Sequence, residues 1–181
     1  GKRIAIAGGG PGGLSAAYYL ELMGHHAVVF EQKSQLGGML RYGIPNYRFP
    51  RERLDEDIEA ILSTGVEVHT GVNIGNGEND ISLSRLREDF DAVYIAIGAH
   101  NDKKIGIEGE DAEGVISAVE MLRTIGANNP PDFTGKTVRE VGGGNVAMDG
   151  TPSAIRLGAT KVVIAYRRAP SDLTALPAER E

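Results

Sequence analysis

Two glycine-rich turns, each set between an apolar strand and a helix, constrain the fold of this 181-residue chain more than any other feature. The first turn is residues 8–13, Gly-Gly-Gly-Pro-Gly-Gly, and fits the pattern G-x-G-x-x-G. The second is residues 142–147, Gly-Gly-Gly-Asn-Val-Ala, and fits G-x-G-x-x-A. Strand, glycine turn, helix and strand thus follow one another twice. This order predicts an α/β fold with two Rossmann-like nucleotide-binding units built on parallel sheets.

The spacing of apolar residues around the turns predicts the elements of each unit. In the first unit we expect strands at residues 2–7, 27–31, 66–70 and 92–97 and helices at residues 14–23, 52–64 and 83–90. In the second we expect helices at residues 116–125 and 145–157 and strands at residues 136–141 and 161–168. A polar, acidic connector at residues 101–114 separates them, so the predicted domains are residues 1–105 and 106–181.

Composition excludes several classes of function. The formal net charge of −6 argues against a basic surface for nucleic acid or for anionic lipid. No apolar run approaches the ~20 residues of a membrane-spanning helix, so we expect no membrane span and a cytoplasmic protein. The chain has no cysteine and therefore holds no disulfide, no thiolate metal site and no cysteine-ligated iron–sulfur cluster of its own.

The first turn carries the parts of a dinucleotide site. Gly8 allows the tight turn, Gly10 lets the backbone approach a pyrophosphate, and Gly13 packs the helix against the strand. The helix that follows presents free N–H groups to the phosphates. Glu31, at the end of the next strand, can accept hydrogen bonds from both ribose hydroxyls. The alternative is a tight strand–helix connection that binds no ligand.

The second turn differs in the charge that follows its second strand. The residues there are Arg167 and Arg168 instead of an acid. Guanidinium groups bind phosphate in a bidentate manner, so this pair suits the 2′-phosphate of NADP. We therefore expect FAD at the first turn and NADPH at the second, with hydride passing between them. A solvated basic strand end is the alternative.

Further motifs lie between and beyond the turns. Residues 36–45 read Leu-Gly-Gly-Met-Leu-Arg-Tyr-Gly-Ile-Pro, and residues 47–50 read Tyr-Arg-Phe-Pro. Ala-Ile-Gly-Ala at 96–99 and Tyr-Arg-Arg at 166–168 complete the set. Together with the glycine turns, these motifs make the chain resemble the small subunit of NADPH-dependent glutamate synthase. The same module is found in the flavin half of dihydropyrimidine dehydrogenase and in electron-bifurcating transhydrogenase large subunits.

This resemblance implies a flavoprotein oxidoreductase module that passes hydride or electrons between NADPH and FAD and on to iron–sulfur centres. Those centres would lie in partner domains or chains of a hetero-oligomer. The resemblance also implies that Glu31 binds the FAD adenosine ribose, that the backbone of residues 37–40 lines the flavin, that Arg48 lies near FAD and that Gly98 allows close approach. We expect no catalytic side chain and no metal ligand, because hydride transfer to flavin needs positioning. The residues expected to bind the two cofactors are Gly8, Gly10, Pro11, Gly13, Glu31, Gln32, Gly38, Met39, Leu40, Arg48, Gly98, Gly142, Gly144, Asn145, Val146, Arg167 and Arg168.

The sequence also departs from the family. Residues 136–181 supply one strand–helix–strand unit, which cannot bury both faces of a parallel sheet. The rest of the NADPH domain and the returning segment of the FAD domain are missing, so both units are expected to be incomplete and the chain to be part of a larger flavoprotein. Arg139-Glu140 should place one charge on a covered face, because consecutive strand residues face opposite sides. Pro152 is expected to interrupt the second glycine-turn helix.

Two other functions are compatible with parts of this pattern. A non-catalytic module would bind FAD as a structural element of a redox complex, with a degenerate NADPH half, as the charges at residues 139–140 and Pro152 suggest. An NAD-dependent dehydrogenase without flavin would use Glu31 for the NAD ribose. The motif at residues 37–45 and the second glycine turn argue against the dehydrogenase.

Overall fold

The computed structural model describes residues 1–176, and residues 177–181 of the predicted second domain lie outside this range. The chain divides into two compact units. Unit 1 is residues 1–41 and 49–99, and unit 2 is residues 42–48 together with the chain from residue 100 onward. The short segment 42–48 therefore belongs to unit 2, although its neighbours in sequence on both sides belong to unit 1.

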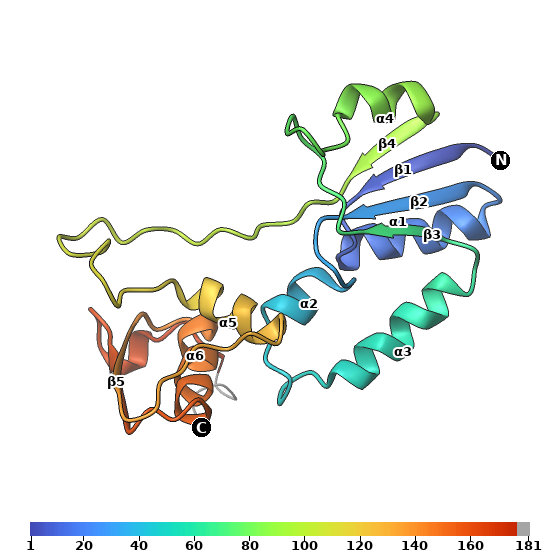
Figure 1. Ribbon diagram of the computed structural model, residues 1–181. Coiled ribbons are helices and arrows are strands. Elements are labelled where there is room, and N and C mark those ends of the chain that lie inside the picture. Colours follow the sequence, from blue (N-terminus) through green and yellow to red (C-terminus); the bar gives the residue numbers. More distant parts are fainter. Residues whose placement is uncertain (177–181) are drawn as a thin grey trace. The chain divides into compact units, whose positions relative to one another are not determined.

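Unit 1 is built on a four-stranded parallel sheet (Figure 1). Its strands are β1 (Arg3–Ala7), β2 (His26–Glu31), β3 (Glu67–Thr70) and β4 (Ala92–Ile95). They lie in the order β3-β2-β1-β4, with Ala7 of β1 opposite Phe30 of β2 and Ile95 of β4. All four carboxyl ends therefore meet at one edge of the sheet, where α/β proteins bind their ligands.

Helices cover both faces of this sheet. The helices of unit 1 are α1 (Pro11–Leu22), α2 (Gly38–Tyr42, whose last residue falls in unit 2), α3 (Arg51–Leu62) and α4 (Leu83–Asp89). Ile6 packs with Leu14 of α1 and Leu54 of α3, whereas Ala5, on the other face, packs with Leu86 of α4. The alternation of Ala5 and Ile6 follows from the two-residue period of a strand. The apolar spacing predicts α1, α3 and α4 but not the short α2.

Unit 2 contains the second glycine turn. Its elements are α5 (Ala118–Gly126), β5 (Thr137–Val141), α6 (Asn145–Arg156), β6 (Lys161–Ala165) and a short 3₁₀ helix η1 (Pro170–Asp172). Strands β5 and β6 form a two-stranded parallel sheet, and α6 packs against both strands and against α5. The predicted α/β fold with parallel sheets is confirmed in both units.

The predicted interruption of the second glycine-turn helix is wrong. Helix α6 runs continuously from Asn145 to Arg156 with Pro152 inside it. Proline cannot donate a backbone hydrogen bond, and its ring crowds the preceding turn. The missing N–H leaves the Met148 carbonyl without its usual helical donor, and the nearby hydroxyls do not replace it, because Thr151 Oγ1 donates to Ala147 O at 3.1 Å and Ser153 Oγ donates to Asp149 O at 2.6 Å. Helix α6 packs against α5, β5 and β6, and this packing holds the helix together past the proline.

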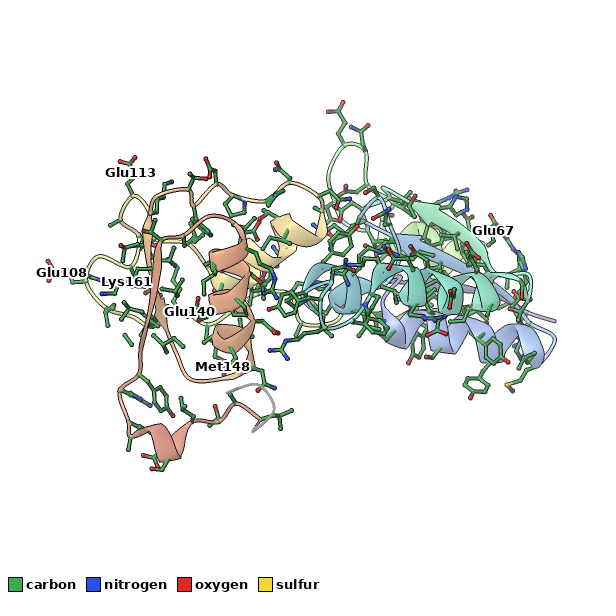
Figure 2. All side chains as sticks on the ribbon, turned by 90° about the horizontal axis from the view of Figure 1, so that it is seen from below. Glu67, Glu108, Glu113, Glu140, Met148 and Lys161 are labelled. Atoms are coloured by element: carbon green, nitrogen blue, oxygen red, sulfur yellow. The ribbon has the colours of Figure 1, made fainter. Side chains whose placement is uncertain are left out.

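Strand β5 buries one of its two adjacent charges, as the alternation of strand side chains predicts. Glu140 is 8% exposed and lies between β5 and α6 (Figure 2). Arg139 is exposed. The Glu140 carboxylate faces Gly150 of α6, where a Cβ would lie 2.6 Å from Glu140 Oε2. Because residue 150 is glycine, the space beside it is free for the Glu140 carboxylate.

Candidate functional site

The first glycine turn connects β1 to α1 at the carboxyl edge of the unit 1 sheet. Gly8 has a φ of 111°, and its N–H donates to Phe30 O at 2.8 Å. A Cβ at Gly8 would lie 2.4 Å from Ala96 O, and one at Gly13 would lie 1.9 Å from Gly8 O. Only glycine fits these two positions, so the backbone of the turn is packed as closely as the motif predicts.

Helix α1 presents an uncapped N-terminus to this turn. Gly10 is its N-cap residue, Pro11 is at its first position, and no side chain caps the first-turn N–H groups. The predicted flavin-lining segment, residues 37–40, lies beside this turn, because a Cβ at Gly38 would lie only 2.7 Å from the Gly10 Cα. Met39 and Leu40 follow Gly38 in α2. The structure thus brings residues 8–13 and 37–40 together, and free helix N–H groups beside bare backbone suit a pyrophosphate.

Glu31 is fixed at the end of β2 beside the same turn. It is 7% exposed, and its Oε2 accepts a hydrogen bond from Gly9 N at 2.7 Å while Oε1 accepts one from Lys33 N at 2.8 Å. Each carboxylate oxygen keeps a further lone pair for a ribose hydroxyl. Gln32 follows with an exposed side chain. Gly9 is a site residue that the glycine pattern does not single out, because it occupies a variable position of the motif.

Gly98 completes the carboxyl edge of unit 1. It has a φ of 67° and follows β4, whose register is continued by a hydrogen bond from Ala96 N to Ala7 O at 2.8 Å. The β4 end therefore lies against the first glycine turn, where Gly8 approaches Ala96 O. A bare glycine backbone at this place fits the predicted close approach of a cofactor.

The second glycine turn connects β5 to α6 in unit 2 in a similar way. Gly142 has a φ of 148°, and its N–H donates to Ala165 O at 3.0 Å. Gly144 is the N-cap residue of α6, without a side-chain cap, and Asn145 and Val146 form the first turn of the helix. The Asn145 side chain is already engaged, because its Oδ1 accepts a hydrogen bond from Leu176 N at 3.0 Å.

Arg167 and Arg168 follow β6, the second strand of this unit. Both side chains are exposed, and neither makes a hydrogen bond or ion pair with any other residue of the range 1–176. Two uncommitted guanidinium groups at this strand end suit an anionic ligand such as a ribose 2′-phosphate.

Arg48 belongs to unit 2, whereas residues 37–40 belong to unit 1. In unit 2 its Nε donates to the Asp149 carboxylate on α6, and the neighbouring Tyr47 hydroxyl donates to Asp149 O at 3.2 Å. The Arg156 guanidinium lies over the Tyr47 ring, 4.0 Å from its centroid. Asp149, which the sequence analysis does not single out, is therefore the partner that positions Arg48 in this structure. Contact of Arg48 with FAD stays a prediction.

The sequence of the chain matches the model of a known protein family that spans both glycine turns. The model of a family described as pyridine nucleotide-disulphide oxidoreductase matches residues 2–176, almost the whole chain. The chain belongs to this family. Pyridine nucleotide-disulphide oxidoreductases bind FAD and NADP(H), and the chain is an oxidoreductase module of this type. A dehydrogenase that uses no flavin does not fit this family.

Curated relatives support the resemblance predicted from the motifs. The NADP(+)-dependent formate dehydrogenase subunit beta of Moorella thermoacetica is 44% identical over 177 residues, which are 97% of this chain and 25% of the relative. The NADPH glutamate synthase small chain of Escherichia coli K12 is 35% identical over 178 residues, 93% of this chain and 37% of the relative. The resemblance to the glutamate synthase small subunit is confirmed. The chain spans about a quarter of the first of these relatives.

Solved structures of other pyridine nucleotide oxidoreductases share the fold. FprA of Mycobacterium tuberculosis, solved in complex with NADPH, matches with a TM-score of 0.81 and 24% identity over 98% of this chain and 46% of FprA. Thioredoxin reductase of Lactococcus lactis matches with a TM-score of 0.67 and 24% identity over 99% of this chain and 60% of the reductase. At this level of identity the likeness concerns the fold alone.

Residues 1–176 hold neither a metal-binding cluster nor a membrane-spanning helix. These residues contain no group of three or more His, Cys, Asp or Glu side chains that could hold a metal ion. No helix among them is long and apolar enough to cross a membrane. The two glycine turns, one in each unit, and the side chains around them are the candidate functional sites of this oxidoreductase module.

Proposed function

We propose that this chain is the part of a larger NADPH oxidoreductase that binds FAD in unit 1 and NADPH in unit 2. Hydride passes between NADPH and FAD, and electrons continue to iron–sulfur centres in partner domains or chains of a hetero-oligomer. The observation that carries this proposal is the opposite charge after corresponding strands: Glu31 ends β2, and Arg167 and Arg168 follow β6. An acid suits ribose hydroxyls, whereas arginines suit a 2′-phosphate.

The residues of the chain bind and orient the two cofactors. A bound flavin supplies the exchange between two-electron and one-electron transfer. Gly8, Gly10 and Gly13 leave room for the first pyrophosphate, and the N-terminus of α1 stabilises its charge. Glu31 holds the adenosine ribose, and the backbone of residues 37–40 lines the flavin. Gly98 lies at the same sheet edge and allows the cofactor to approach the backbone.

The second turn performs the same task for the nicotinamide nucleotide. Gly142 and Gly144 open the turn, and the uncapped N-terminus of α6 faces the phosphates. Arg167 and Arg168 bind the 2′-phosphate and thereby select NADPH over NADH. Hydride transfer between two such cofactors requires that their reacting rings be held in place, and it requires no protein acid or base.

The names of the relatives agree with this proposal. Two carry NADP(+) or NADPH in their names and are called beta subunits: the formate dehydrogenase subunit above and the NADPH-Fe(3+) oxidoreductase subunit beta of Geobacter sulfurreducens, which is 42% identical over 96% of this chain. The glutamate synthase relative is a small chain. These names support NADPH as the nucleotide and a multi-subunit assembly. The cytoplasmic location expected from the sequence stays a prediction.

A second candidate function is a FAD-binding structural module whose NADPH half is inactive. The buried carboxylate of Glu140 and the proline inside α6 favour it, because both weaken the helix-and-strand framework of the second turn. The two candidates differ in one observable. Only the oxidoreductase module lets NADPH reduce the flavin.

An anaerobic visible spectrum of the protein in its natural assembly, before and after NADPH, tests the proposal. We expect a flavin spectrum that bleaches with NADPH and much less with NADH. A flavin that neither nucleotide bleaches would favour the structural module. A protein that binds no flavin would refute both candidates.

Removing the arginine pair is expected to weaken the binding of NADPH and to leave the binding of NADH nearly unchanged. With Arg167→Leu and Arg168→Leu together, KM for NADPH should rise about 100-fold or more, because each of the two charge-assisted hydrogen bonds contributes roughly 1.5–3 kcal/mol. KM for NADH should stay within about twofold of wild type. Steady-state flavin reduction measures both values. Lys161→Ala is the control, since it removes a cation from the opposite end of β6 and should leave both KM values unchanged.

A further inference from the structure

The chain segment after β6 returns to the second glycine turn and lies along it. We call residues 173–176 the strap. Thr174 N and Ala175 N both donate to Gly143 O at 3.1 Å, and Leu176 N donates to Asn145 Oδ1 at 3.0 Å. Ala175 is only 2% exposed and packs with Ala147 and Met148 of α6. The strap is therefore bound to the turn by hydrogen bonds and by apolar contact.

Gly143 is in contact with two side chains of the segment that follows β6, Tyr166 and Leu173. A Cβ at Gly143 would lie 2.6 Å from Leu173 Cδ2 and 2.7 Å from Tyr166 Cε2. The Tyr166 ring, at the start of the segment, and the Leu173 side chain, at its end, thus both pack against the bare Gly143 backbone. A side chain at residue 143 would therefore displace Tyr166 or Leu173 from the turn.

Residues 167–172 form a loop between Tyr166 and the strap, and hydrogen bonds hold the two ends of this loop together. The Tyr166 hydroxyl donates to Asp172 O at 2.8 Å. Asp172 N donates to Ala169 O at 2.9 Å, and Ala169 N donates to Asp172 Oδ2 at 3.3 Å. Residues 167–172 therefore form a short loop whose two ends are held together over the glycine turn.

Arg167 and Arg168 lie inside this closed loop. Their side chains have no hydrogen-bond or ion-pair partner within residues 1–176. The conformation of the loop backbone therefore sets the position from which the two arginine side chains extend. We propose that Tyr166 is a positioning residue for nucleotide specificity: by closing loop 167–172 over Gly143, it places the arginine pair for a ribose 2′-phosphate. This inference rests on the proposed function of unit 2.

The proposal separates the phosphate-selecting loop from the pyrophosphate-binding turn. The strap uses the Gly143 carbonyl and the Asn145 side chain, and it leaves the first-turn N–H groups of α6 without a side-chain cap. Loss of the Tyr166–Asp172 hydrogen bond should therefore affect recognition of the 2′-phosphate and spare recognition of the rest of the nucleotide. A residue with a merely structural role would affect both.

Tyr166→Phe tests the proposal, because it keeps the ring against Gly143 and removes only the hydroxyl. The probes are 2′,5′-ADP, which carries the 2′-phosphate, and 5′-AMP, which does not, each titrated calorimetrically into the full protein in its natural assembly. We expect the Kd of 2′,5′-ADP to rise about 3- to 10-fold, the range of one neutral hydrogen bond, and the Kd of 5′-AMP to stay unchanged. KM for NADPH should rise by the same factor with kcat unchanged.

Ser171→Ala is the matched control, since it removes an exposed hydroxyl from the same loop and should leave every value at wild type. Equal weakening of both probes, or wild-type affinity for both, would overturn the role of Tyr166. If wild-type protein binds 2′,5′-ADP no more tightly than 5′-AMP, the 2′-phosphate site itself is absent and the proposed function fails with it. Tight wild-type binding of 2′,5′-ADP with an unaffected Tyr166→Phe variant refutes the positioning role alone.

Discussion

Replacing Gly13 with alanine should destabilise unit 1 by about 3 kcal/mol or more, the upper range for overpacked sites. The new Cβ would lie 1.9 Å from Gly8 O and 3.2 Å from Ile6 Cγ2. Ile6 is fully buried in the sheet, and the Gly8 oxygen belongs to the backbone of the turn, so neither can move aside without disturbing the packing. The added methyl group must instead push α1 away from β1.

The backbone of Gly8 is held in place from two sides. The Gly8 N–H donates to Phe30 O at 2.8 Å, and the Gly8 Cα lies so near Ala96 O that an added Cβ would be 2.4 Å from that oxygen. Shifting Gly8 to accommodate a methyl group at residue 13 would therefore break the link between the turn and both β2 and the end of β4. FAD binding should be lost together with stability, since the same backbone forms the expected pyrophosphate site.

Gly12→Ala provides a matched control one residue away. A Cβ at Gly12 meets nothing within 4 Å, and its backbone lies in α1. Alanine there should be neutral or stabilise the protein by a few tenths of a kcal/mol through its helix propensity. Urea unfolding followed by circular dichroism, which suits a chain without tryptophan, compares the two variants. Equal midpoints for Gly13→Ala and wild type would contradict the packing described here.

The parts of the fold that could be predicted are those with local signals. Strand β1, the first glycine turn and α1 follow one another within residues 3–22, and each has its own signature of apolar run, glycines and helical spacing. Glu31 could be assigned because it ends the next strand along the chain. Such features depend on neighbours in sequence, and local patterns specify them well.

The parts that could not be predicted depend on residues far apart in sequence. The Arg48–Asp149 ion pair joins positions 101 residues apart, and no pattern in the sequence links them. The contact of Gly143 with Leu173 depends on how the chain returns after β6. Pro152 predicts a break that does not occur, because α6 packs against α5, β5 and β6 and this tertiary packing overrides the local preference.

Neutralising Glu140 should stabilise unit 2 above neutral pH. Burial raises the pKa of Glu140 from its ordinary value of 4.5 to about 7. No hydrogen bond or ion pair from the described residues reaches its carboxylate, so nothing offsets the cost of the buried charge. Because the folded state binds this proton more tightly than the unfolded state, the contribution of Glu140 to stability is most favourable below pH 4.5 and is lost as the pH rises to about 7.

The expected loss is about 2 kcal/mol, which allows for partial hydration of the carboxylate. Glu140→Gln keeps the shape of the side chain and removes its titration. This variant should therefore match wild type near pH 4.5 and exceed it by about 2 kcal/mol at pH 8. Glu108→Gln, which removes an exposed carboxylate from the connector (Figure 2), is the control and should change stability little at either pH. Urea unfolding at both pH values measures the difference.

A double-mutant cycle between Glu140 and Gly150 tests the packing that underlies this pH dependence. In wild type, Gly150→Ala brings a Cβ within 2.6 Å of Glu140 Oε2, so the carboxylate must move and the helix gains little. In a Glu140→Val background the space is free, and alanine should stabilise α6 by up to about 1 kcal/mol through its helix propensity. The stability change of the double variant should therefore differ by about 1 kcal/mol from the sum of the changes in the two single variants. Additive effects would show that Glu140 does not occupy the space beside Gly150, and the burial that raises its pKa would have no structural basis.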